Sequence, residues 1–410
     1  MNNAILRHNC AQAWLAQFEE GDRSAAEKLL ALVTLISSDE FRSGLTALLE
    51  DRLEAGPQPI ALYNEVERRH WKGVPNRLFK EPRRKIKRAC GRSGPSLMPR
   101  QRSIDEEVGS EGVVANILTQ FQRNRKQRIS LSPGPDIIRE RHIRRFVLVT
   151  DFIGSGKRAC SFLDAAWRVR SVRSWWSRRA RSGWSFEVVA FAGLPSGIAE
   201  VRRHRCQPRV TVRVIAPTIR STFLPSEARI LEDLCHRYPT GVVSPLGYDD
   251  GAALIAFAHS MPNNAPAVFW SQAKGWRALF PARTTTGTET PFEAGLDAAA
   301  IQERLGAASG LISYAKGEAH ISIEVIVLSA LRRSPRSVDA ISGRLGLDRA
   351  KVNAVLNELR KLEWISESNQ ITERGRLVLK RLQDAGEPKL LPRSDPGLYF
   401  PKSLRALRNV

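Results

Sequence analysis

Acidic residues, cysteines and long apolar runs are all scarce in this sequence. Its 410 residues include 42 Asp and Glu against 64 Lys and Arg, so that the formal net charge is +22. No apolar run approaches the roughly 18 residues of a membrane-spanning helix, which argues against a membrane protein. Such a shortage of negative charge favours a polyanionic partner, with nucleic acid the default, although a basic protein can also simply be soluble.

The five cysteines form neither a CxxC pair nor a zinc-ligand spacing, and the N-terminus lacks the apolar core of a signal peptide. Their scatter excludes a disulfide framework and indicates the reduced thiols of a cytoplasmic protein. Hydrophobic residues make up 42% of the chain, so that its length can supply the cores of two or three domains.

Residues 146–166, FVLVTDFIGSGKRACSFLDAA, have the pattern of a strand, a glycine loop and a helix. Glycines let the backbone approach a ligand, and the free N–H groups of a first helical turn attract an anion. We therefore expect a phosphate site here, with Asp151 at the strand end contacting ribose hydroxyls or a metal. The alternative is an ordinary connection between a strand and a helix. The expected phosphate-binding residues are Gly154, Ser155, Gly156, Lys157 and Arg158.

Strands and helices alternate through the middle of the chain. Such alternation predicts an α/β fold, in which helices cover both faces of a mostly parallel sheet. Ligands bind such sheets at the carboxyl ends of the strands, where we expect Asp151, the 193–196 turn and the segment after Ala258 to converge. The predicted strands are 146–149, 186–192, 210–216, 253–258 and 267–270, and the predicted helices are 158–180, 196–204 and 226–237.

The segments around this core are helical or basic. Apolar spacing predicts helices throughout residues 1–70, with Asp39 as an N-cap. The basic, proline-broken stretch 68–102 suits either a nucleic-acid backbone or a solvated loop. Acidic residues before an expected helix at 113–121 either cap it or belong to a site. Arginines and tryptophans at 167–184 suit stacking on nucleic acid, although a core role is the better explanation for Trp167.

Residues 321–382 follow the pattern of a winged helix-turn-helix. A helix at 323–331 precedes two helices capped by Ser337 and Asp348, and wing strands are expected at 364–365 and 370–371. The third helix fits a recognition helix for nucleic acid, although such modules also mediate protein contacts. Its residues left for solvent or nucleic acid are Arg349, Lys351, Asn353, Asn357, Arg360 and Lys361.

The glycine-loop segment resembles the phosphoribosyl-pyrophosphate loop of type I phosphoribosyltransferases. In that family an apolar strand leads into two acids, two apolar residues and a small cluster. Here Thr150 replaces the first acid, Asp151 is the second, and Gly154-Ser155-Gly156 is the cluster. The resemblance implies a type I phosphoribosyltransferase-like topology, phosphoribosyl pyrophosphate or a nucleotide as ligand, Mg²⁺ on the pyrophosphate and Asp151 as the catalytic acid. Because the acid pair holds ribose hydroxyls, Thr150 bears on catalysis more than on the fold.

A second resemblance covers nearly the whole chain. Phosphoribosyltransferase-like proteins of bacterial conflict systems, including retron loci, carry a strand followed by His and Pro-Asn-Asn, with a Gly-Tyr motif upstream. This resemblance adds Asn263 and Asn264 to the ribosyl site, although alone they would indicate a turn. It also implies a reverse transcriptase partner with its RNA–DNA hybrid. The matching residues are His259, Pro262, Asn263, Asn264, Trp270, Gly247 and Tyr248, with an acidic motif at 106–112 and a tail motif at 398–405.

We expect an antiphage defence effector that transfers or cleaves at C1 of a ribosyl phosphate or nucleotide, is toxic when active, and binds DNA or an RNA–DNA hybrid. The alternatives are a non-catalytic nucleotide sensor and a transcription regulator gated by a ribosyl ligand. The expected parts are an N-terminal helical lobe (1–70), a phosphoribosyltransferase-like α/β core with the basic loop (71–283), a linker with a short helix (284–320), the winged helix-turn-helix (321–385) and a tail (386–410).

Overall fold

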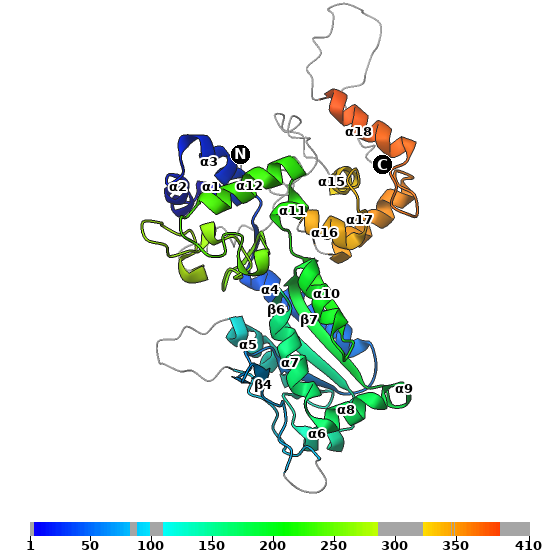
Figure 1. Ribbon diagram of the computed structural model, residues 1–410. Coiled ribbons are helices and arrows are strands. Elements are labelled where there is room, and N and C mark those ends of the chain that lie inside the picture. Colours follow the sequence, from blue (N-terminus) through cyan, green and yellow to red (C-terminus); the bar gives the residue numbers. More distant parts are fainter. Residues whose placement is uncertain are drawn as a thin grey trace, which may run out of the picture.

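The computed structural model describes residues 4–82, 88–98, 110–285, 323–345, 347 and 349–385. Its centre is a five-stranded parallel sheet, which confirms the expected α/β fold (Figure 1). Strands β6 and β7 are apolar along most of their length because both faces of the sheet are covered. The sheet order is β5 (Ile129–Leu131), β2 (Ile60–Asn64), β6 (Arg145–Ile153), β7 (Ser185–Gly193) and β8 (Arg209–Ile215).

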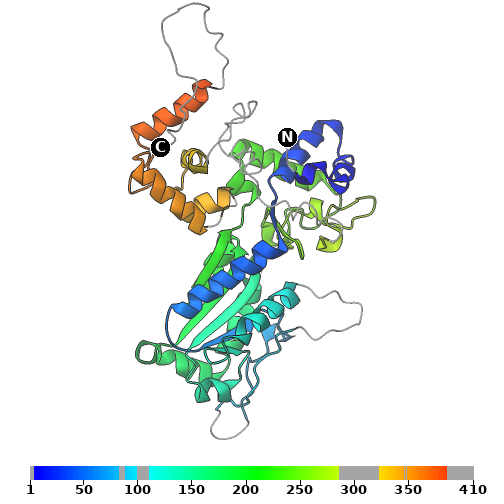
Figure 2. The ribbon, with the colours of Figure 1, turned by 180° about the vertical axis from the view of Figure 1, so that it is seen from behind.

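Helices cover the two faces of the sheet in separate groups. One face packs against α4 (Ser38–Glu54), which crosses in front of the sheet in Figure 2, and against α5 (Ser110–Arg123). The other face packs against α6 (Pro135–Glu140), α7 (Lys157–Trp167), α8 (Arg170–Ser177) and α10 (Pro195–Arg203). The short helix α9 (Arg179–Ser182) leads from α8 into β7, and the hairpin β3 (His70–Trp71) and β4 (Val74–Pro75) follows β2.

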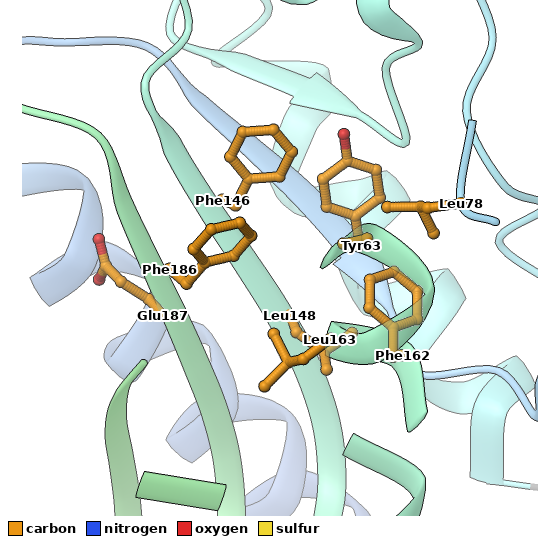
Figure 3. A pocket seen from close by; sticks show the side chains of 9 residues that line it. Tyr63, Leu78, Phe146, Leu148, Phe162, Leu163, Phe186 and Glu187 are labelled. Atoms are coloured by element: carbon orange, nitrogen blue, oxygen red, sulfur yellow. The ribbon is translucent and has the colours of Figure 1, made fainter. Parts of the chain in front are cut away.

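Aromatic side chains fill the space between the sheet and α7 (Figure 3). Tyr63 and Phe146 stack with ring centroids 5.7 Å apart, and Phe162 of α7 lies 5.9 Å from Tyr63. The cavity between these residues measures about 10 Å³, roughly the space of one water molecule. Because it is so small and its lining is almost entirely apolar, it is a packing gap of the core and not a ligand site.

The N-terminal helices α1 (Ala4–Arg7), α2 (Asn9–Leu15) and α3 (Glu20–Ala31) share their core with much later parts of the chain. Helix α12 (Pro225–Arg237) packs against α3, and α11 (Ile219–Thr222) precedes it. Trp14 stacks on Phe269 at 5.4 Å and donates a hydrogen bond to the Val268 carbonyl at 2.9 Å. These first helices thus share one hydrophobic core with residues 219–280.

Two expectations about strands are wrong. Residues 1–70 are not helical throughout, because β1 (Thr34–Ile36) and β2 are short buried apolar runs that pair with distant strands. The 267–270 segment is a 3₁₀ turn, η2 (Ala267–Phe269), and not a strand. Pro266 precedes this turn. The indole N–H groups of Trp14 and Trp276 both donate to the carbonyl of Val268, which a strand would use to pair with its neighbour.

Other elements differ in their bounds. The strand expected at 253–258 is β9 (Ile255–Phe257), which pairs with β1 in a separate sheet. The helix expected at 158–180 breaks into α7 and α8, because the carboxylate of Glu81 accepts the backbone N–H of Arg170 at 2.7 Å. Ser37 rather than Asp39 caps α4, since its hydroxyl accepts the Glu40 N–H at 3.1 Å.

The C-terminal module has the expected helices α15 (Ile323–Ala330), α16 (Val338–Leu345), α17 (Arg349–Lys361) and α18 (Glu373–Ala385). Ser337 caps α16 as expected, and the wing is reduced to a single bridge between Ile365 and Ile371. No described helix is long and apolar enough to cross a membrane. Outside the described residues lie Gly346, Asp348, the stretches 83–87 and 99–109, the helix expected at 297–307 and the tail motif at 398–405.

The C-terminal module packs against the edge strand of the sheet. The backbone N–H of Ile215 in β8 donates to the Ser342 hydroxyl at 3.3 Å, and Arg333 donates to the Phe223 carbonyl at 2.8 Å. A Cβ at Gly343 would lie 3.0 Å from Ile215, so that the small residue permits the close approach. The module therefore covers part of an edge that would otherwise expose unpaired backbone groups.

Candidate functional site

A cavity of about 190 Å³ opens at the carboxyl end of β6. Its walls come from segments far apart in the chain: Glu65 after β2, Ser110 of α5, the glycine loop with the start of α7, and residues 260–264 with Tyr248 and Arg283. The 193–196 turn is not among its lining residues. The structure does bring together the site residues expected from the sequence, which are Asp151, Gly154, Ser155, Gly156, Lys157, Arg158, Asn263 and Asn264.

The glycine loop is held by close backbone packing. Gly156 has a left-handed conformation with φ 79°, and a Cβ there would lie 2.6 Å from the carbonyl oxygen of Gly197 in α10. A Cβ at Gly154 would overlap the side chain of Asn264. The N-cap residue Gly156 has no side chain to cap α7, and the Ser155 hydroxyl accepts the Lys157 N–H at 3.4 Å. The other N–H groups of the first turn are therefore left for an anion in the cavity.

Two carboxylates lie at the inner end of the cavity, on neighbouring strands. Asp151 belongs to β6, and Glu65 directly follows β2, which pairs with β6. Between them the Thr150 hydroxyl donates to Glu65 at 2.7 Å and lies 3.2 Å from Asp151. Thr150 stands where the phosphoribosyltransferase loop has its first acid. Its hydroxyl thus contacts an acid that follows the adjacent strand.

The surroundings shift the two carboxyl groups in opposite directions. Burial raises the pKa of Glu65, and the charge of Arg158 and the Thr150 hydrogen bond offset this only in part. Burial also raises the pKa of Asp151, but the hydrogen bond from His259, at 3.4 Å, and the charge of Arg158 outweigh it, so that the pKa of Asp151 lies below its ordinary value. The cavity therefore holds one strongly ionised acid beside one that keeps its proton to higher pH.

Both cations of the loop are matched to acids at the rim. Arg158 pairs with Glu111 of α5, and although burial lowers its pKa, the charges of Glu65, Glu111 and Asp151 outweigh burial and raise it. The Lys157 ammonium lies 3.0 Å from Asp249 and 4.9 Å from the centroid of the Tyr248 ring. An incoming phosphate therefore meets two positioned cations that already have partners.

The Gly247-Tyr248 and Asn263-Asn264 motifs form one structural unit opposite the glycine loop. The Tyr248 N–H donates to the Asn263 carbonyl at 2.8 Å, and the Asn264 amide donates to the Tyr248 carbonyl at 2.8 Å. Gly247 has φ 83°, and a Cβ there would lie 2.6 Å from the Asn264 backbone, so that this turn requires a glycine. Tyr248 begins the 3₁₀ turn η1 (Tyr248–Asp250), and η3 (Pro281–Arg283) carries the lining residue Arg283.

Sequence reasoning missed Glu65 and Arg283. Glu65 is a polar residue directly after the apolar run 60–64, which is the same signal that pointed to Asp151. The expectation of helices throughout residues 1–70 hid it. Arg283 follows no strand or motif, and only the fold brings it to the cavity.

The residues expected to bind nucleic acid on α17 do not share one face. Arg349 pairs with Asp339 at 2.7 Å and donates to the Val212 carbonyl of β8. Arg360 donates to Asn357 and to Asn369 of the wing loop, each at 2.6 Å. The exposed residues of the expected set are Lys351, Asn353, Asn357 and Lys361, and Lys361 pairs with Glu358 at 2.8 Å.

A parallel sheet with a glycine loop and acids at its carboxyl end defines a phosphoribosyltransferase-like α/β protein, here joined to a winged helix. The chain belongs to the PRTase-CE family, whose model matches residues 11–282, more than half of the chain. Residues 325–406 match the family described as wHTH-PRTase associated. No curated protein and no solved structure matches the chain.

Proposed function

We propose that the protein is a nucleotide-related effector of a bacterial antiphage system, and that its cavity takes the ribosyl phosphate part of phosphoribosyl pyrophosphate or of a nucleotide. The observation that carries this proposal is the meeting of the glycine loop and the Glu65–Asp151 pair in one cavity. The first turn of α7 offers N–H donors for a phosphate, and the carboxylates offer acceptors for sugar hydroxyls.

The carboxylates have different tasks in this proposal. Asp151, whose pKa is lowered, keeps its negative charge and favours the positive charge that develops at C1 as the bond to the leaving group breaks. Glu65, whose pKa is raised, keeps its proton to higher pH than an ordinary carboxyl group, and the Thr150 hydroxyl links it to Asp151. Two acids with separated pKa values are the usual arrangement for acid and base roles in one site.

Mg²⁺ fits this site only together with its ligand. Among the described residues no three Asp, Glu, His or Cys side chains gather into a metal cage. Mg²⁺ commonly takes one or two carboxylates and completes its shell with phosphate oxygens and water. Asp151 and Glu65 are the carboxylates that would hold it, and the ion would neutralise charge on the pyrophosphate.

A non-catalytic nucleotide sensor is the second candidate. Thr150 at the first acidic position favours it, as do the rim acids that already engage Lys157 and Arg158. A transcription regulator gated by a ribosyl ligand would need α17 free for DNA, whereas Arg349 contacts β8. For the effector we further propose a cytoplasmic location, a reverse transcriptase partner as in retron loci, and contact with its RNA–DNA hybrid.

Calorimetric titration with phosphoribosyl pyrophosphate and with nucleotides, followed by mass spectrometry of the mixture, tests the proposal. Binding with release of pyrophosphate or a free base supports an enzyme. Binding without any change in the ligand supports a sensor. The absence of binding to every one of these ligands, by a protein whose unfolding is cooperative, would overturn the ribosyl phosphate site itself.

A further inference from the structure

A surface remote from the cavity carries exposed arginines that form no ion pair with any described residue. Residues 168–184 contain no Asp or Glu. Helices α8 and α9 lie together because α9 follows α8 directly and leads into β7. They occupy the end of the sheet opposite the winged helix (Figures 1 and 2). We define the arginine surface as the exposed residues Arg170, Arg173, Arg178 and Arg181.

The acids closest in the fold already have partners. Glu187 pairs with Arg145 at 2.8 Å, and Glu81 accepts a backbone N–H and pairs with Arg77 at 3.6 Å. Among the described residues, no member of the arginine surface forms an ion pair. Four like charges are thus held on one surface without compensation, an arrangement that a polyanion would stabilise.

The chemistry of this surface favours nucleic acid over a membrane or an apolar protein partner. The large hydrophobic side chains that are exposed lie elsewhere, for example Trp71, Ile230 and Val243, and none lies between residues 168 and 209. A membrane or a protein interface normally requires such apolar anchors. Guanidinium groups, in contrast, match phosphate oxygens with two parallel hydrogen bonds and need no apolar contact.

The tryptophan side chains of this region make their ring contacts within the protein. Trp175 and Trp184 stack on each other with centroids 4.8 Å apart and an interplanar angle of 4°. Trp176 is buried, with the Arg179 guanidinium 4.4 Å from its ring centroid. No ring is therefore left for stacking on an unpaired base, and the contacts that remain are to phosphates.

We propose that the arginine surface binds the phosphate backbone of a duplex nucleic acid without reading its sequence. The inference does not depend on the ribosyl phosphate site, because it uses no residue of the cavity. It also differs from binding through α17, whose Arg349 and Arg360 have intramolecular partners. The surface lies on the α/β domain, so that the winged helix stays docked on β8 in the complex.

Fluorescence anisotropy of the full chain on two unrelated duplexes and on an RNA–DNA hybrid, over a range of salt concentrations, tests the proposal. The variant is Arg173→Ala with Arg178→Ala and Arg181→Ala. The matched control is Arg229→Ala with Lys274→Ala and Arg277→Ala, which removes the same charge from exposed positions elsewhere. For the arginine variant we expect the slope of log K against log salt to fall by about 0.9 for each lost contact, and for the control to remain near the parent slope.

A second variant has lysine at the same three positions. It keeps the positive charge and loses the two parallel hydrogen bonds that a guanidinium group makes to phosphate. Its salt slope should stay near that of the parent while affinity falls, because lysine contacts phosphate as a point charge. An unchanged slope in the alanine variant would overturn the proposal. Binding of the parent to phosphatidylserine vesicles but not to duplexes, lost in the alanine variant, would overturn it in favour of a membrane.

Discussion

The Thr150 hydroxyl lies 2.7 Å from Glu65 and 3.2 Å from Asp151, and so joins two acids whose pKa values are shifted in opposite directions. A hydroxyl has one proton and cannot donate to two ionised carboxylates at once. The shorter contact marks Glu65 as the acceptor of the Thr150 proton, and Asp151 has His259 as a further partner at 3.4 Å. Burial raises the pKa of Glu65 although the Thr150 hydrogen bond offsets part of this, whereas His259 and Arg158 keep the pKa of Asp151 low.

Replacement of Thr150 tests this link. Thr150→Val keeps the shape and removes the hydroxyl, leaving buried Glu65 without its hydrogen bond, and should lower the free energy of unfolding by about 1–3 kcal/mol. Thr150→Ser keeps the hydroxyl and should retain most of the stability. Denaturant unfolding of the three proteins provides the measurement. Equal stability of the valine variant and the parent would show that the hydrogen bond contributes nothing.

The raised pKa of Glu65 predicts a pH dependence of stability. The folded state binds this proton more tightly than the unfolded state, so the parent loses stability as pH rises from the ordinary value of 4.5 toward the raised value. Glu65→Gln has no proton to lose there and should become more stable relative to the parent as pH rises. Unfolding curves at several pH values measure the difference. A difference that stays flat from acid to neutral pH would contradict the shift.

Asp151 is the acid on which turnover depends in our proposal. Asp151→Asn keeps the size and removes the charge, so that any turnover should fall by about 10²–10³ while the fold survives. Asp164→Asn is the control, since Asp164 lies on the adjacent helix and pairs with Arg205 away from the cavity. Nucleotide and phosphoribosyl pyrophosphate pools under phage challenge are the measurement. Identical pools with intact protection in the Asn variant would exclude catalysis.

Gly156 should be intolerant of a side chain for two separable reasons. Its φ of 79° strains any other residue, and a Cβ would meet the Gly197 carbonyl. Gly241 has the same φ of 79° but nothing within 4 Å, so Gly241→Val measures strain alone, about 1–2 kcal/mol. We expect Gly156→Val to cost more and to abolish ligand binding in calorimetry. Unchanged binding would place the phosphate elsewhere.

The exposed face of α17 and its inner end should respond differently to mutation. Lys351→Ala with Lys361→Ala should lower the salt slope of duplex binding by about one unit for each residue that contacts phosphate. Arg349→Ala should leave that slope unchanged and weaken the docking on β8, because its guanidinium contacts Asp339 and Val212. Anisotropy and thermal unfolding separate these effects. A lower slope for Arg349→Ala would mean that the module undocks when it binds.

Much of the fold and half of the candidate site follow from local pattern in the sequence. The alternation of apolar runs with amphipathic segments predicts strands and helices because burial on a given face requires a given period. The glycine loop and Asp151 are recognisable because a strand, a left-handed glycine and a helix start are consecutive in the chain. The caps at Ser337 and Thr372 are equally local, since each side chain accepts an N–H within three residues.

What the tertiary structure alone decided are the contacts between segments distant in sequence. Glu65 meets Thr150 across 85 residues because β2 lies beside β6, and the apolar run of β2 would fit other neighbours in the sheet equally well. Arg349 and Lys351 look alike in the sequence, yet one docks on β8 and the other is exposed. Periodicity in the sequence determines which face of a helix or strand is buried. The packing of all elements together determines which neighbour that face contacts, and thus which charged side chains remain for a ligand.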